Sequence, residues 1–116
     1  GRIIAVRGNC DSEVDQMQIS YPMMGDSARI ICDNRTFFLS HGHIFAPDIL
    51  PPLPEGAVFV FGHIHTMVAD KVGDVVCFNP SSISLPKEEH HTWGRYADGV
   101  LEIVNTDGNI LKRLEL

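Results

Sequence analysis

The sequence predicts an α/β domain of the strand-rich α+β kind, with at most two short helices. Three observations lead to this prediction. Short apolar runs recur along the chain, turn-forming residues separate them, and four prolines between residues 46 and 56 restrict helix formation there. The 116 residues contain no internal repeat, low-complexity segment or linker, and we therefore expect a single domain over residues 1–116.

The first elements along the chain are a predicted strand and a predicted short helix. Arg2–Val6 is an apolar run bounded by Gly8, which is consistent with a fully buried strand. Residues 11–17 begin with acids and with residue types that favour helix N-caps, and this start favours a short helix.

Pairs of β-prone runs predict three hairpins in the rest of the chain. The hairpins join 28–32 to 36–39 across Asp33-Asn34, 68–71 to 75–78 across Gly73-Asp74, and 97–104 to 110–114 across Thr106–Asn109. Between the first two, the proline-rich segment has room for at most a short helix before Pro51, and Val58–Phe61 is a second buried strand.

Composition excludes several classes of protein. The chain is 44% hydrophobic and 21% charged, as in ordinary globular proteins, and its net charge of −6 argues against general nucleic-acid binding. We see no apolar stretch of membrane-spanning length and no signal peptide, and we expect no membrane partner. Three scattered cysteines without a CxxC pair favour a reducing compartment, and a cytoplasmic location is predicted.

The strongest chemical signal is a pair of His-x-His motifs, His41/His43 and His63/His65, each at the end of an apolar run. Imidazole is the commonest protein ligand for transition metals. In an extended segment, residues i and i+2 point the same way and lie roughly 6.6 Å apart. Such a pair can serve one ion, or two ions about 3.5–4 Å apart. Two half-buried imidazole pairs bonded to backbone are the structural alternative, but two pairs within 25 residues, each beside a glycine, favour a shared metal site.

A second candidate motif is Gly8-Asn9-Cys10-Asp11, which follows the first predicted strand. By itself it is typical of a turn, but the amide oxygen of Asn9 is a neutral, hard metal ligand. Cys10 is either a small buried filler or a group that faces the substrate. Both His pairs and Asn9 come just after predicted strands, where ligand sites gather in open α/β sheets.

Three further groups have a structural interpretation beside a functional one. Asn79-Pro80-Ser81-Ser82 is either a proline-initiated turn or a polar loop near the site. For His90-His91, in the polar run after Lys87, a solvated loop is favoured over a rim on the substrate side. For Trp93 and Tyr96, packing on the domain is favoured over lining a pocket.

The four motifs together resemble the calcineurin-like metallophosphoesterase superfamily, and most closely its small YfcE-type phosphodiesterase branch. They occur in the family's order: Gly8-Asn9-Cys10-Asp11, Ser40-His41-Gly42-His43, Gly62-His63-Ile64-His65 and Asn79-Pro80-Ser81-Ser82. The resemblance covers nearly the whole chain. It implies the C-terminal part of a ββ-sandwich flanked by helices.

The resemblance also implies a metal-ligand set. Asn9, His41 and His63 would bind one ion of a two-metal centre, and His65 the other. Two divalent ions lower the pKa of a shared water, which then attacks phosphorus in line. The resemblance favours Mn²⁺, with Zn²⁺, Ni²⁺ or Fe as alternatives that also accept mixed nitrogen and oxygen ligands.

The resemblance to the family also implies catalytic roles for two residues, His43 and Cys10. His43 would either contact a metal ligand or face the phosphate. Cys10 stands where protein phosphatases have a leaving-group histidine. The cysteine argues for small phosphodiester, or phosphomonoester, substrates rather than phosphoproteins. Two departures are milder: Ile64 replaces the usual Thr, and Ser81 replaces the usual Gly of the Asn-Pro-Gly-Ser element.

The large departure is the absence of the family's Asp-x-His and Gly-Asp motifs, which supply two aspartates and a histidine. The chain therefore resembles a metallophosphoesterase that lacks its N-terminal strands. We expect it to bind at most one ion, weakly, and to turn over little substrate alone. The alternative function is a catalytically inactive metal-binding or protein-interaction module. An unprotected apolar edge at Arg2–Val6 predicts a homodimer, or association with the missing N-terminal part.

Overall fold

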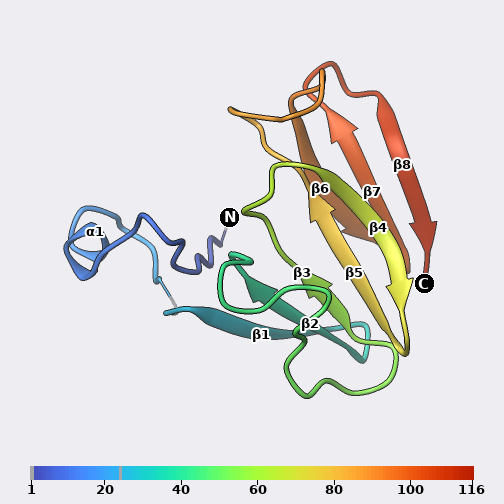
Figure 1. Cartoon of the computed structure of the whole chain (residues 1–116), viewed down its shortest axis with the longest axis horizontal. Helices are drawn as coiled ribbons and strands as arrows, with labels where there is room; N and C mark the ends of the chain where they lie inside the picture. Colours follow the sequence, from blue (N-terminus) through green and yellow to red (C-terminus); the bar gives the residue numbers. More distant parts are fainter. Residues whose placement is uncertain (1, 24) are drawn as a thin grey trace.

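The structure is a computed structural model that describes residues 2–23 and 25–116. In these residues the chain forms one helix and eight strands (Figure 1). The elements are α1 Glu13–Gln16, β1 Ser27–Cys32, β2 Arg35–Ser40, β3 Val58–Val60, β4 Met67–Val72, β5 Val75–Pro80, β6 Thr92–Ala97, β7 Val100–Asn105 and β8 Ile110–Glu115.

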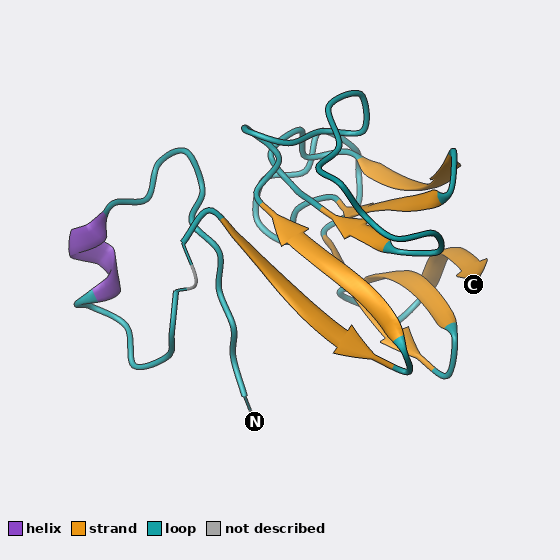
Figure 2. Cartoon of the chain, turned by 90° about the horizontal axis from the view of Figure 1, so that it is seen from below, coloured by secondary structure: helices purple, strands orange, loops and turns teal. Residues whose placement is uncertain are grey.

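The strands form two sheets. The larger sheet has the order β1-β2-β3-β5-β4, and the smaller sheet has the order β6-β7-β8 (Figure 1). Figure 2 shows the strands after a turn of 90°. In the larger sheet β2, β3 and β5 are parallel, while β1 and β4 pair antiparallel at its edges. The carboxyl ends of the three parallel strands therefore meet at one edge of the sheet, which is where ligand sites of open α/β sheets lie.

The core occupies both faces of the central strands. Between the two sheets pack Phe37, Val58, Val76, Phe78, Leu101 and Ile103. On the opposite face, a second cluster contains Phe38, Phe59, Phe61, Val75 and Cys77, and side chains of the segment 45–53 cover it. Successive residues thus alternate between two buried faces, which explains why these strands are continuous apolar runs in the sequence.

Most of the predicted turns are confirmed. Asp33 and Asn34 both have positive φ, 52° and 59°, as a two-residue type I′ hairpin requires. Turns at 73–74 and 106–108 join β4 to β5 and β7 to β8. The short helix is confirmed as α1, where the Ser12 amide donates to Asp15 Oδ2 at 2.7 Å.

The predicted buried strand at Arg2–Val6 is wrong. This segment forms only an isolated bridge between Ala5 and Met23, and the side chains of Ile3 and Ile4 are exposed. A β-prone run needs a neighbouring strand to satisfy its backbone groups. Here two hydrogen bonds anchor it, from the Ala5 amide to the Pro22 carbonyl and from the Arg7 amide to the Gly25 carbonyl.

Two other expectations need correction. The sandwich is not flanked by helices in the described residues, where α1 is the single helix and no helix is long and apolar enough to cross a membrane. The predicted strand 97–104 is divided by a turn at Asp98-Gly99, where both residues have positive φ, 50° and 78°. The strand before this turn, β6, was not predicted, because Gly94 interrupts its β-prone residues.

Candidate metal centre

Three loops meet at the carboxyl ends of β2, β3 and β5. The loop after β2 is joined to the loop after β3 by a hydrogen bond from the Gly62 amide to the His41 carbonyl, 2.8 Å. The loop after β3 is joined to the end of β5 by the fully buried Asn79, whose Nδ2 donates to the Gly62 carbonyl at 3.0 Å. One backbone hydrogen bond and one side-chain hydrogen bond thus hold both His-x-His motifs at one end of the sheet.

Three imidazole rings cluster there. The ring centroid of His41 lies 5.2 Å from that of His43 and 5.1 Å from that of His63, and the His43 and His63 centroids are 6.3 Å apart. The Nδ1 atoms of His41 and His43 are 3.2 Å apart. This separation fits a shared proton, and it also fits two ligands of one ion, since tetrahedral nitrogen ligands at about 2.0–2.1 Å lie about 3.4 Å apart.

His65 is oriented by the following loop. Its Nδ1 lies 2.6 Å from the Leu85 carbonyl oxygen, so Nδ1 carries the proton and donates it. The Nε2 lone pair is then available. A ring nitrogen that donates to a carbonyl while the other nitrogen binds the metal is the usual arrangement of metal-ligating histidines.

The backbone of the second motif is strained. His63 and His65 have φ values of 66° and 57°, in the left-handed region that non-glycine residues rarely adopt. The sequence predicted an extended backbone with both rings on one face, and this prediction is wrong for the His63/His65 pair. The Ser81 side chain helps to hold the conformation, since its Oγ donates to the His65 carbonyl at 2.9 Å. Such strain clusters at functional sites.

The turn that carries Asn9 and Cys10 lies against the ring of His41. The Gly8 amide donates to Asp11 Oδ2 at 2.8 Å, and a Cβ added to Gly8 would lie 3.1 Å from His41 Cδ2. Asn9 and Cys10 are both exposed. The turn therefore presents both side chains to solvent beside the imidazole cluster.

The neighbourhood of His41 favours the neutral form of its imidazole. Burial, and then the nearby His63 and His43, lower the pKa of His41 below its ordinary value, while the Asp11 carboxylate acts in the opposite direction. A neutral imidazole is the form that binds a metal. The donor chemistry thus fits a transition metal.

The arrangement is nevertheless incomplete as a metal site. Among the described residues, no group of three His, Cys, Asp or Glu side chains is placed together as an ion would require. His41, His43 and His63 are brought together, His65 lies on the same loop, and Asn9 on the adjacent turn. None of these candidate ligands is a carboxylate, and an additional carboxylate would be needed to balance two dications.

Sequence reasoning missed the contributions of three side chains. The charge of the Asp11 carboxylate acts on His41 and raises its pKa. The sequence signal for this role was the place of Asp11 in the Gly8–Asp11 motif. Asn79 and Ser81 act as supports for the second motif, so the interpretation of this segment as a polar loop near the site is favoured over a simple turn.

The remaining candidates lie outside the cluster. His90 is exposed, and the Nδ1 of His91 donates to the Ile83 carbonyl at 2.8 Å, which fits the predicted surface loop. Tyr96 packs against Phe37 with ring centroids 4.8 Å apart, whereas Trp93 is 41% exposed. Tyr96 therefore both packs on the domain and lines a cavity, whereas packing describes the exposed Trp93 less well.

The two-sheet fold that carries this candidate site is also found among known proteins. The family model described as calcineurin-like phosphoesterase superfamily domain matches residues 1–98. The chain belongs to this superfamily.

Among curated proteins, the chain is 41% identical over 104 residues to "Phosphodiesterase YfcE" of Escherichia coli K12. The match covers 89% of this chain and 56% of the relative, so the chain spans little more than half the length of that protein.

Solved structures show the same fold. A YfcE phosphoesterase from E. coli aligns with a TM-score of 0.90 at 39% identity, over 96% of this chain and 62% of that one. Vps29 of Entamoeba histolytica, in a complex with Zn²⁺, aligns with a TM-score of 0.56 at 18% identity, over 95% of this chain and 67% of that one. The second likeness concerns the fold alone.

Proposed function

We propose that this chain supplies part of the active site of a metal-dependent phosphodiesterase that acts on small substrates. The observation that carries the proposal is the cluster of His41, His43 and His63 at the carboxyl ends of the parallel strands, in a chain of the calcineurin-like phosphoesterase superfamily. Its three unpaired thiols would stay reduced in the cytoplasm, where we place the protein.

The proposed ligands follow from this cluster. Asn9, His41 and His63 would hold one divalent ion, Mn²⁺ by preference, and His65 would hold a second through Nε2. When bound, two such ions activate a water and neutralise the charge that develops on the phosphoryl oxygens. The Nδ1–H of His65 stays on the Leu85 carbonyl, which fixes the ring plane and the tautomer.

The other residues of the site have positioning or substrate-facing roles. His43 is exposed, and its Nδ1 lies 3.2 Å from the Nδ1 of His41. Its side chain would face the phosphate. Cys10 is exposed on the turn beside His41, where it would line the substrate side without serving as a leaving-group acid. Asn79 and Ser81 hold the strained Gly62–His65 loop, because their side chains donate hydrogen bonds to the carbonyls of Gly62 and His65.

A catalytically inactive module is the second candidate. It is favoured by the incomplete ligand set of the described residues. In that case the histidines would bind a metal weakly and the chain would serve as a binding partner.

Hydrolysis of bis-p-nitrophenyl phosphate with added Mn²⁺ distinguishes the two candidates. We expect little turnover from the chain alone, and turnover from the chain joined to the part of Phosphodiesterase YfcE outside the matched region. In the joined protein, His63→Ala should reduce the rate at least a hundredfold, while the matched control His90→Ala should leave it unchanged. Absence of turnover in the joined protein would reject the enzyme and favour the binding module.

A further inference from the structure

Four exposed apolar side chains belong to the loops of the candidate metal centre. They are Ile44 in the loop after β2, Ile64 in the loop after β3, and Ile83 and Leu85 in the segment after β5, with exposed fractions of 46%, 39%, 61% and 69%. Exposed apolar side chains that are scattered singly need no explanation, but a group of them on the loops of one candidate site indicates a binding surface.

The segment after β5 is held against the ring of His65. The Leu85 carbonyl accepts from His65 Nδ1 at 2.6 Å. In return, the His65 carbonyl accepts from the Lys87 amide at 3.0 Å and from Ser81 Oγ at 2.9 Å. Within the segment, Ser82 Oγ accepts from the Leu85 amide at 2.9 Å. The exposed Leu85 side chain therefore leaves the backbone next to an imidazole that would hold the second metal ion.

The three loops that follow β2, β3 and β5 carry no fixed charge. Residues 41–46, 62–66 and 80–86 contain no Asp, Glu, Lys or Arg. Lys87 comes next, but two acids follow it directly, so this end of the segment has no excess of positive charge. A second phosphate or a carboxylate on a substrate would need Lys or Arg side chains as partners. These loops instead complement an uncharged, apolar group.

A phosphodiester brings two ester groups to such a site. Its phosphorus must lie at the imidazole cluster if bound metal ions are to act on it, and both ester groups then extend from the phosphorus toward the surrounding loops. This step rests on the proposed function, since it takes the cluster as the place where the phosphoryl group binds. The side chains that these loops expose then decide which ester groups the site accepts.

We propose that the loops after β3 and β5 form an apolar wall that binds one ester group of the substrate, with Ile64 and Leu85 as specificity-determining residues. The substrate class is then a phosphodiester with an apolar or aromatic ester group, such as a phenyl ester, and not one whose ester group bears a further charge. The wall contributes affinity because apolar area of both the ester group and the side chains is removed from water.

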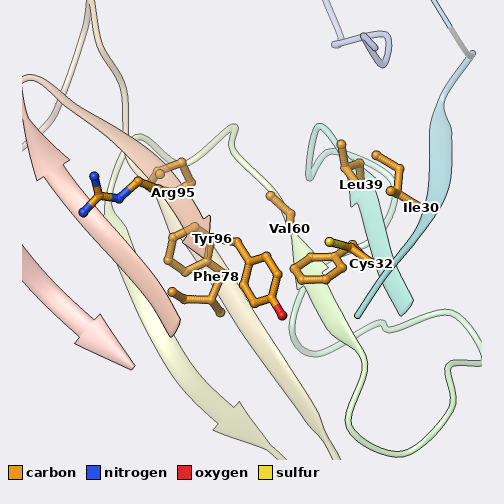
Figure 3. Close-up of a pocket in the computed structure, with 11 residues that line it drawn as sticks. Ile30, Cys32, Leu39, Val60, Phe78, Arg95 and Tyr96 are labelled. Atoms are coloured by element: carbon orange, nitrogen blue, oxygen red, sulfur yellow. The ribbon is translucent and has the colours of Figure 1, made fainter. Parts of the chain in front are cut away.

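The cavity between the two sheets is the competing apolar surface. It has a volume of about 320 Å³, and its lining includes Ile30, Val60 and Tyr96 (Figure 3). No histidine lines this cavity. An apolar compound that bound there would not need its phosphoryl group at the imidazole cluster, so the Ile30 side chain reports on this alternative.

Binding of two probes that differ only in their ester groups tests the proposal in the unmodified chain. The probes are diphenyl phosphate and dimethyl phosphate, each titrated into the 116-residue chain in the presence of Zn²⁺ and followed by methyl NMR. We expect diphenyl phosphate to shift the methyl signals of Ile64 and Leu85 and to bind about tenfold more tightly than dimethyl phosphate. The signals of Ile30 and of Ile110, which is 51% exposed on β8, should not move.

A serine variant separates the apolar wall from the hydrogen bonds of the segment. Leu85→Ser keeps the backbone carbonyl that accepts from His65 and removes the apolar side chain. It should weaken the binding of diphenyl phosphate about fivefold and leave the binding of dimethyl phosphate unchanged. The matched control Ile110→Ser, also at an exposed apolar side chain, should change neither affinity.

The proposal is overturned by equal affinities for the two probes, by binding of neither, or by equal weakening in both serine variants. Shifts of Ile30 in place of Ile64 and Leu85 would assign the apolar probe to the cavity and also overturn it. All of these outcomes leave the proposed function standing, because that function is rejected by absence of hydrolysis in the joined protein. The two failures are therefore distinguishable.

Discussion

Truncation of Asn79 to alanine tests whether the loop that carries His63 and His65 depends on one buried side-chain amide. In the wild type this side chain is fully buried at the end of β5. Its Nδ2 donates to the Gly62 carbonyl at 3.0 Å, and its Oδ1 accepts from the Ser81 amide at 2.9 Å. Asn79→Ala removes both bonds and leaves two backbone groups without their partners.

The expected loss of stability follows from those two groups. A fully buried donor or acceptor left unsatisfied costs about 1–3 kcal/mol, so two would cost about 2–6 kcal/mol. Because both hydrogen bonds of Asn79 are only part-buried, Asn79→Ala should lower the free energy of unfolding by about 2–4 kcal/mol. The variant should also lose metal affinity at least tenfold, because the Gly62–His65 segment, with two residues at positive φ, loses a support.

Asn105 provides a matched control. It is also a buried asparagine whose Oδ1 accepts two backbone amides, those of Asp107 and Asn109, but it lies in the β7–β8 hairpin. Urea unfolding gives the stability of both variants, and calorimetric titration with Zn²⁺ gives the affinity. Asn105→Ala should cost similar stability and leave the metal affinity unchanged. Equal loss of affinity in both variants, or unchanged affinity in Asn79→Ala, would refute the positioning role.

Two further predictions concern packing and thiol chemistry. Gly94→Ala should destabilise the fold by about 1–3 kcal/mol in urea unfolding, since the new Cβ would lie 2.6 Å from the Phe78 ring; unchanged stability would contradict this packing. Under native conditions Ellman's reagent should modify two thiols, those of the exposed Cys10 and Cys32, and a third only after unfolding, because Cys77 is buried and burial raises its pKa. Three reactive thiols in the folded chain would contradict the buried position.

The central strands and turns could be predicted from the sequence because their determinants are local. Asp33-Asn34 specifies a tight hairpin through its own backbone preference. The continuous apolar run at 58–61 reports burial on both faces, which the structure confirms for Val58 and Phe59. The position of both His-x-His motifs after these strands follows from the same pattern.

The details of the site depend on contacts between distant residues and were not predictable. The positive φ values of His63 and His65 are held by Asn79 and Ser81, which lie 14 or more positions further along the chain. The proximity of Asp11 to His41 likewise comes from the folding of separate loops. Periodicity reports which face of a strand is buried, but not how a loop turns after the strand ends.

The same limit explains the two errors in strand prediction. Arg2–Val6 has the composition of a buried strand, but strand formation needs a partner. Among residues 2–23 and 25–116 this segment forms a single isolated bridge, between Ala5 and Met23. In β6, Gly94 weakens the local strand signal, while its lack of a side chain allows the strand to approach Phe78.

The most direct test of a shared metal centre is paramagnetic line broadening by Mn²⁺. In NMR spectra of the 116-residue chain, the imidazole signals of His41, His63 and His65 and the side-chain amide of Asn9 should broaden together at the same substoichiometric Mn²⁺ concentration. The signals of His90 should stay sharp. Broadening of the four groups at different concentrations, or of His90 before them, would show that they do not form one site.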